Sequence, residues 1–348
     1  TAGFHAQVRE FARAQGVRVH EVGEGISHTI AVERGYVRPG QLVIGADSHT
    51  VTCGALNAFA VGVGSSDLAA AMLTGQLWLR VPQTIRVVLN GARQADVAAK
   101  DIALAMVAAL GTDGADYHAL EIGGPATNQF TLDDRLVLSN LAVEAGAKAA
   151  LWEADEVLRE GLRARGIEEI APVVADTGAR YARELVLDLS SLTPRVALPH
   201  SPGNVVPIDI APDTPIHMVF LGTCTGGRVA DYHEAVAVLE RGGGRIADGV
   251  QLVVTPASRE IERRLAADGT LDKLARMGAV VTTPGCGACC GTSGVIPGDG
   301  MNVMSTANRN FKARMGNATA SIYLASPAAC AAAALTGRIT DPRSVRGS

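Results

Sequence analysis

Short apolar runs that alternate with helical patterns along the chain of 348 residues constrain the fold most strongly. The apolar runs have the length of buried strands and lie at 41–46, 84–89, 217–221 and 250–255. Between them, helical periodicity occurs at 5–15, 67–79, 98–110, 132–145, 228–241 and 258–267. This alternation predicts an α/β protein with mostly parallel sheets covered by helices, whose ligands bind at the carboxyl ends of strands.

Two breaks in the alternation predict domain boundaries. Pro82 precedes a new strand after a long helical stretch. Six prolines crowd the stretch 193–215, which has few helical signals and is typical of a linker. We therefore expect three units, at 1–82, 83–197 and 198–348.

Charge and hydropathy exclude two classes of protein. The net charge is −4 and no block of basic residues occurs, which argues against nucleic-acid binding. The apolar stretches are shorter than the roughly 18 residues of a membrane span.

Three of the six cysteines crowd into 286–290, which favours a metal or redox site in a reducing compartment over a secreted disulfide framework. We expect a cytoplasmic protein.

The cysteines fall into two motifs. Cys224 lies in a Gly-Thr-Cys-Thr-Gly-Gly segment between a strand and a helix, where the helix dipole favours a thiolate, although a buried turn residue would also fit. Cys286 and Cys289 form a Cys-x-x-Cys pair between glycines. Zinc sites usually need two such pairs or added histidines, whereas three thiolates suit a cubane iron–sulfur cluster with one iron open as a Lewis acid. A thioredoxin-like redox pair is the competing interpretation, but this chain matches it only in the spacing of the two cysteines.

A third motif follows the first predicted strand. Asp47 and His49 can point to one side of an extended chain, so that the carboxylate orients the imidazole, although an Asp/Ser turn explains the pattern as well. The nearby stretch 61–67 resembles the start of a dinucleotide fingerprint. We reject it because Asp67 replaces the third glycine and would repel a pyrophosphate.

Two further groups could bind a substrate. Arg309 and Arg314, together with Asn308, would form a clamp for a di- or tricarboxylate, although a solvated basic loop is the commoner cause of such a run. Asn140 and Glu144 are spaced i,i+4 and therefore share one face of the predicted helix 132–145. They could contribute to a site, or they could simply be a pair on the protein surface.

In this order the motifs resemble the aconitase superfamily, and more narrowly the large subunits of 3-isopropylmalate dehydratase and homoaconitase. The motifs are Asp-Ser-His, Asn-x-x-x-Glu, Gly-Thr-Cys-Thr, Pro-Gly-Cys-x-x-Cys and Asn-Arg-Asn-Phe-x-x-Arg, and the resemblance runs from about Val17 to Thr340. It implies three α/β/α domains of the aconitase iron–sulfur type. It also implies a hydro-lyase that dehydrates and rehydrates a 2-hydroxy di- or tricarboxylate, with 2-isopropylmalate (leucine biosynthesis) favoured over homocitrate (lysine biosynthesis).

The resemblance also implies roles for individual residues. Three thiolates would hold a [4Fe–4S] cluster whose fourth iron binds the substrate: Cys224, Cys286 and Cys289. The catalytic groups would be Asp47, His49, His28 and Glu144. The substrate and the exposed side of the cluster would be contacted by Ser48, Asn140, Asn308, Arg309 and Arg314.

Three departures from the family pattern affect these roles. Gly226 replaces a common Asn, so a hydrogen bond near the cluster is missing or comes from Thr225. Cys290 follows the cysteine pair where the family often has an apolar residue, and we expect it to pack. The family's N-terminal segment carries an Asp-His pair that protonates the leaving hydroxyl, and we expect that pair to be missing here, since the sequence begins at Thr1.

The general base is also expected elsewhere. In the family it is a Ser on a swivelling domain, which belongs to a separate small subunit in two-subunit members, and we expect such a subunit as partner. Because both the acid and the base are outside this chain, a non-catalytic iron–sulfur or zinc-binding protein is the alternative from another class.

Overall fold

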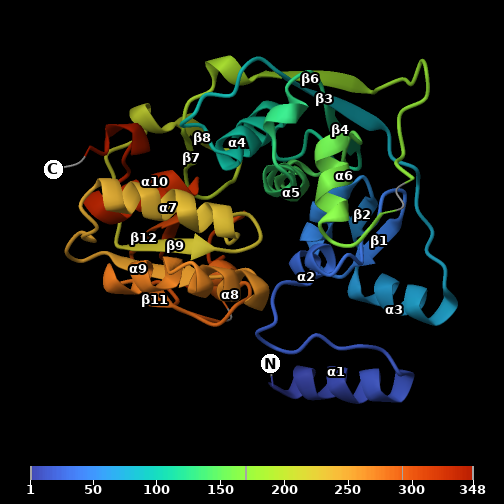
Figure 1. Cartoon of the computed structure of the whole chain (residues 1–348), viewed down its shortest axis with the longest axis horizontal. Helices are drawn as coiled ribbons and strands as arrows, with labels where there is room; N and C mark the ends of the chain where they lie inside the picture. The colour runs from blue at the N-terminus through green and yellow to red at the C-terminus, as the bar shows by residue number, and fades with distance from the viewer. Residues whose placement is uncertain (1, 169–170, 292, 347–348) are drawn as a thin grey trace.

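The computed structural model describes residues 2–168, 171–291 and 293–346, whose strands form three sheets (Figure 1). Two sheets are parallel throughout, and in the third only β7 pairs antiparallel with its neighbours. The α/β class with mostly parallel sheets is therefore confirmed. Among the described residues, no helix combines the length and the hydropathy that crossing a membrane requires.

The N-terminal part holds the smallest sheet. Its elements are α1 (Ala2–Gln15), α2 (Ser27–Glu33), β1 (Leu42–Gly45), the 3-10 helix η1 (Ser48–Leu56), β2 (Phe59–Gly62) and α3 (Ser65–Thr74). β1 and β2 pair in parallel, and α1 lies apart from the other elements (Figure 1). α3 ends earlier than the predicted 67–79, because Gly75 adopts a φ of 70° and closes the helix.

The second sheet has four strands in the order β5-β4-β3-β6. They are β3 (Thr84–Asn90), β4 (Ala119–Gly123), β5 (Ala149–Trp152) and β6 (Arg183–Asp188). The helices of this part are α4 (Ala99–Leu110), α5 (Leu132–Leu141), α6 (Glu156–Arg163) and the 3-10 turns η2 (Thr127–Gln129), η3 (Ala142–Ala145) and η4 (Leu189–Ser191). The predicted helix 132–145 is thus α5 continued by η3. α5 packs against both α4 and η1 and so joins this part to the first.

The third sheet has seven strands in the order β11-β10-β9-β12-β13-β7-β8. They are β7 (Arg195–Ala197), β8 (Val205–Pro207), β9 (Met218–Gly222), β10 (Gln251–Thr255), β11 (Val280–Val281), β12 (Asn302–Ser305) and β13 (Ser321–Ala325). Its helices are α7 (Val229–Arg241), α8 (Arg259–Ala267), α9 (Thr270–Arg276), α10 (Pro327–Thr336) and the 3-10 turns η5 (Ile208–Ile210), η6 (Gly287–Cys290) and η7 (Pro342–Ser344).

Successive side chains of β9 point to opposite faces of the third sheet, and both faces are buried. Val219 and Leu221 pack with α7, α8, α9 and α10 in one apolar cluster, whereas Met218 and Phe220 join a second cluster that includes the cores of the other two sheets. The sheet therefore rests directly on the rest of the molecule, and the ends of its strands meet the helices α4 and α5.

The proline-rich stretch 193–215 differs from the linker that we predicted. It contains β7, β8 and η5, and β7 pairs with β13 and β8 of the third sheet although it lies within 83–197. Proline is tolerated here because β8 is an edge strand and Pro207 ends it. The division into three units stays a prediction.

Candidate functional site

The three cysteines of the predicted cluster site lie near the carboxyl ends of strands in the third sheet. Cys224 comes two residues after β9, and Cys286 and Cys289 belong to the turn around η6, which follows β11. Gly287 lets this turn approach β10, since a Cβ there would lie 2.6 Å from the Thr255 hydroxyl oxygen. The turn glycine thus brings the Cys-x-x-Cys pair to the sheet.

The thiols influence one another through space. Burial, with a smaller contribution from Cys289, raises the pKa of Cys224 to about 12. Burial also raises the pKa of Cys286, with contributions from Cys224 and Cys289, and burial raises the pKa of Cys289 despite the opposing charge of Arg314. The structure therefore brings the three predicted ligands together, with Cys224 and Cys289 buried and Cys286 half-buried.

Two buried asparagines connect these sulfurs. Asn140 and Asn308 donate from Nδ2 to the Cys224 Sγ at 3.0 and 3.4 Å, and the Asn308 Oδ1 accepts from the Cys289 Sγ at 3.5 Å. Asn308 also donates to the Asn140 Oδ1 at 3.2 Å, and Arg314 Nη2 lies 3.9 Å from the Cys289 Sγ. Both predicted amides thus face the sulfurs.

We expected a hydrogen bond near the cluster either to be missing or to come from Thr225. Its hydroxyl donates to the Thr306 carbonyl at 2.7 Å and not to a sulfur. A side chain at position 226 would collide with Thr306, because a Cβ on Gly226 would lie 2.3 Å from the Thr306 Cβ. Hydrogen bonds to the Cys224 sulfur therefore come from the asparagines.

The donor set fits a cluster better than a single zinc ion. Among the described residues, no group of three or more His, Cys, Asp or Glu side chains is close enough to hold one metal ion. Sulfurs that share a zinc ion lie within ~4 Å of one another, since each is about 2.3 Å from the metal. In a cubane cluster each thiolate binds a different iron, so three cysteines, of which Cys224 and Cys289 are buried and Cys286 is half-buried, fit such a cluster without sharing one ion.

A chain of polar contacts links the histidine motif to the substrate-binding motif. His49 Nε2 lies 2.9 Å from the Glu144 Oε1, and Arg309 Nε donates to the same oxygen at 2.7 Å. The Asp47 Oδ1 accepts from the His49 backbone N–H at 2.7 Å and lies 3.4 Å from His49 Nδ1. Residues of η1, η3 and the loop after β12 therefore meet.

The carboxylate of Asp47 is ionised. Burial alone would raise the pKa of this carboxyl, but hydrogen bonds from His49 and the proximity of His28 outweigh it and hold the pKa well below its usual range. Asp47 also caps the N-terminus of η1, which fixes the direction of the His49 side chain. Ser48 stands between them, and Gly62 packs so closely on it that a Cβ there would lie 2.7 Å from the Ser48 Cα.

His28 lies in α2, with its ring centroid 6.4 Å from that of His49. Burial lowers the pKa of His28 to about 4, so its imidazole is neutral at neutral pH. Neither ring nitrogen has a hydrogen-bond partner within the part of the chain that the structure describes. His28 is therefore placed beside the histidine motif with both nitrogens available.

Two residues of this region are not predicted from the sequence. Thr52 accepts a hydrogen bond from Asn140 Nδ2 at 2.7 Å, and Lys100 donates from Nζ to the Ala307 carbonyl at 2.6 Å and to the Thr225 hydroxyl and Thr306 carbonyl at 3.2 Å. Burial lowers the pKa of Lys100 to about 8. The composition of α4 offers a signal, because a helix that is apolar on nearly all faces must bury any lysine that it contains.

Mostly parallel sheets with three cysteines near the carboxyl ends of strands define an α/β protein with a cysteine-lined candidate site. The sequence profile of the Aconitase family (aconitate hydratase) matches residues 4–337. The chain belongs to the aconitase family, as the motif order predicted.

Curated relatives are similar over nearly the whole chain. The 3-isopropylmalate dehydratase large subunit 1 of Thermotoga maritima is 48% identical, with 97% of this chain and 80% of the relative covered. The protein of the same name from Methanopyrus kandleri is 45% identical, with 97% and 81% covered. A Methanosarcina mazei protein named "Probable methanogen homoaconitase large subunit" is 41% identical, with 99% and 87% covered.

A solved structure supports the fold. The holo-form of Thermococcus kodakaraensis aconitase X aligns with a TM-score of 0.50 at 13% identity, covering 86% of this chain and 68% of that one. At this identity the similarity concerns the fold alone, and it agrees with the mostly parallel α/β architecture.

Proposed function

We propose that this chain is the large subunit of a [4Fe–4S]-dependent hydro-lyase that converts 2-isopropylmalate to 3-isopropylmalate. The observation that carries the proposal is the convergence of the three thiols with the contacts between His49, Glu144 and Arg309. The higher identity to 3-isopropylmalate dehydratase large subunits, compared with the homoaconitase relative, supports this substrate over homocitrate.

Cys224, Cys286 and Cys289 would hold the cluster. When bound, a cubane with one iron lacking a protein ligand supplies a Lewis acid for hydroxyl and carboxylate oxygens. The chain's own amides would fix the Cys224 sulfur, because Asn140 and Asn308 both donate to it. Arg314, which lies next to Cys289, would place a guanidinium at the same side for a substrate carboxylate.

His49 would hold or move a proton at Nε2. Glu144 accepts from that nitrogen and from Arg309, so a protonated imidazole would be stabilised and its ring fixed in direction. Arg309 is half-buried, with a side-chain exposure of 21%, and its remaining nitrogens would bind a substrate carboxylate. Asp47 would hold His49 Nδ1, and Ser48 and neutral His28 would hydrogen-bond the substrate or a water molecule.

The partner would be a small subunit that carries the Ser base. The matched relatives are named large subunits, which implies a second chain in those proteins. The expected Ser base lies outside this chain's recognised motifs, so the proposed reaction requires that partner to supply it.

The test is anaerobic reconstitution with iron and sulfide, followed by a dehydration assay with the small subunit present. We expect 2-isopropylmalate to be dehydrated at least tenfold more efficiently, in kcat/KM, than homocitrate. The reverse order would favour homoaconitase. A loaded chain that dehydrates no 2-hydroxy di- or tricarboxylate in the complex would contradict the enzyme proposal and leave a non-catalytic cluster protein.

A further inference from the structure

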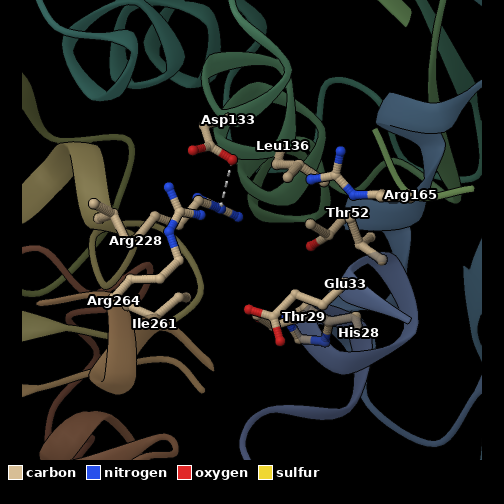
Figure 2. Close-up of a pocket in the computed structure, with 12 residues that line it drawn as sticks. His28, Thr29, Glu33, Thr52, Asp133, Leu136, Arg165, Arg228, Ile261 and Arg264 are labelled. Carbon is tan, nitrogen blue, oxygen red and sulfur yellow. Dashed lines mark ion pairs between the residues drawn. The ribbon is translucent and has the colours of Figure 1, made fainter. Parts of the chain in front are cut away.

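A small cleft separates the first two parts of the chain from the third (Figure 2). Its walls come from α2, α5, the turn after α6, and the N-terminal parts of α7 and α8. Its free volume is about 60 Å³. A bound water needs roughly 10–15 Å³ of such volume, so the cleft has room for a few waters or one small ion.

Three arginines from separate elements line this cleft: Arg165, Arg228 and Arg264. Figure 2 shows Arg228 and Arg264 on one side of the cleft and Arg165 on the other side. Burial lowers the pKa of Arg165, the carboxylates of Asp133 and Glu33 raise it, and the positive charge of Arg264 lowers it by a smaller amount.

The arginines lack close carboxylate partners. Within the described residues, neither Arg165 nor Arg264 has a carboxylate oxygen within 4.0 Å, and Arg228 approaches Asp133 only to 3.9 Å. Arg228 is 5% exposed, and its Nη1 has no hydrogen-bond partner in that part of the chain. A buried guanidinium nitrogen without an acceptor is costly, and an anion would supply the missing acceptor.

The two carboxylates of the cleft do not balance this charge. Asp133 has a half-exposed side chain, lies 3.9 Å from Arg228 and also raises the pKa of Arg165 through its charge. Glu33 accepts a hydrogen bond from the Ser258 hydroxyl at 2.6 Å, and burial raises the pKa of its carboxyl. Three guanidiniums therefore face at most two negative charges, and Thr29 adds a buried hydroxyl without a partner among the described residues.

We propose that this cleft binds a small oxyanion, either inorganic phosphate or the carboxylate of a small acid, between Arg165, Arg228 and Arg264. The anion would bridge α8 and the N-terminus of α7 to the turn after α6. His28 and Thr52, which border the candidate active site, also line the cleft, so occupancy would stabilise the packing behind that site. The inference does not depend on the hydro-lyase proposal, since neither Arg309 nor Arg314 lines the cleft.

The test compares thermal unfolding of the full chain, alone and in complex with its small subunit, in phosphate, acetate and chloride at equal ionic strength. A ligand that binds only the folded state raises the unfolding temperature with concentration. We expect phosphate or acetate to raise the unfolding temperature by a few degrees more than chloride does. The anion with the larger effect shows whether the cleft prefers a phosphate or a carboxylate. The background variant Arg309→Gln should keep this increase, which separates the cleft from the candidate active site.

Variants locate the anion. Arg264 is exposed, and Arg264→Gln should abolish at least half of the increase in unfolding temperature. Arg228 is buried, and Arg228→Met should abolish the increase entirely. Arg263→Gln is the matched control, because Arg263 is the exposed neighbour on α8 and does not line the cleft. The inference is overturned if neither anion exceeds chloride, or if Arg264→Gln and Arg263→Gln retain the increase equally.

Discussion

Lys100 places a positive charge directly beneath the loops that present Cys224 and Asn308. Its three hydrogen bonds reach Thr225, Thr306 and Ala307, which are neighbours of those residues, and its side chain is almost fully buried. The ammonium thus ties helix α4 to the third sheet at the site. At the scale of single residues, this contact explains why a lysine can be buried in a helix that is mostly apolar.

Replacing Lys100 by Met should destabilise the chain. Two buried carbonyls would lose their donor, at roughly 1–3 kcal/mol each, while removal of a desolvated charge offsets part of the loss. We expect the free energy of unfolding in urea to fall by about 2 kcal/mol. Lys148→Met is the control, because Lys148 stacks 5.0 Å over Tyr117 and should cost at most about 1 kcal/mol. Equal losses in both variants would contradict this role.

Glu144 receives hydrogen bonds from His49 and Arg309 at a single oxygen. Glu144→Gln keeps the shape but removes the negative charge that stabilises a protonated imidazole. In the reconstituted complex we expect kcat to fall by about 10²-fold with little change in the unfolding midpoint. Glu156→Gln, which affects only exposed pairs with Arg159 and Arg163, should leave kcat unchanged. An unaltered kcat in Glu144→Gln would remove this residue from the proposed machinery.

At the scale of elements, η1 is held against β5 by the absence of a side chain at Gly54. A Cβ at this position would lie 2.0 Å from the Ala150 carbonyl oxygen. The close approach lets η1 carry His49 and Thr52 to the site while its other residues fill the core. Packing of this element therefore determines where the histidine motif lies.

Gly54→Ala should separate η1 from β5 and destabilise the fold by about 3 kcal/mol, at the upper end of typical overpacking costs. Gly3→Ala provides the contrast, since nothing lies within 4 Å of its Cβ and the position is helical. This control should be neutral or stabilising by up to about 1 kcal/mol. Chemical denaturation of both variants measures the difference, and a Gly54→Ala variant as stable as the parent would show that η1 can shift.

At the scale of the whole molecule, Asp101 couples the second and third sheets. Its carboxylate accepts hydrogen bonds from the backbone N–H groups of Ala98, at the start of α4, and Arg195, at the start of β7. Burial raises the pKa of Asp101 from 3.8 to about 7. The folded state therefore binds a proton that the unfolded state has already released at neutral pH.

This shift predicts a stability that falls as pH rises. A raised carboxyl pKa contributes stability that is fully present below pH 3.8 and is lost as pH rises through about 7. Between pH 6 and 8 the loss from this group is about 1 kcal/mol. Asp101→Asn should flatten this part of the urea-unfolding profile, whereas Asp113→Asn, at an exposed position, should not. A profile that keeps its slope in Asp101→Asn would contradict the assignment.

The parts of the site that follow strands were predictable, and the parts that depend on packing were not. Asp47 and Cys224 follow β1 and β9 by two residues, so the sequence pattern alone places them at the carboxyl ends of parallel strands. Glu144 is predicted as a partner on a helix face, but its contact with both His49 and Arg309 depends on how η3, η1 and the loop after β12 meet. Lys100 and Arg228 lie in ordinary helical patterns, and only the packing of α4 and α7 reveals their burial.

The central claim is that Cys224, Cys286 and Cys289 hold a [4Fe–4S] cluster. The most direct measurement is iron and sulfide content with visible absorption after anaerobic reconstitution, for the parent chain, Cys286→Ala and Cys290→Ala. The account predicts about four irons per chain in the parent and in Cys290→Ala, and loss of the cluster in Cys286→Ala. A cluster retained by Cys286→Ala, or one zinc per chain without cluster absorption, would contradict it.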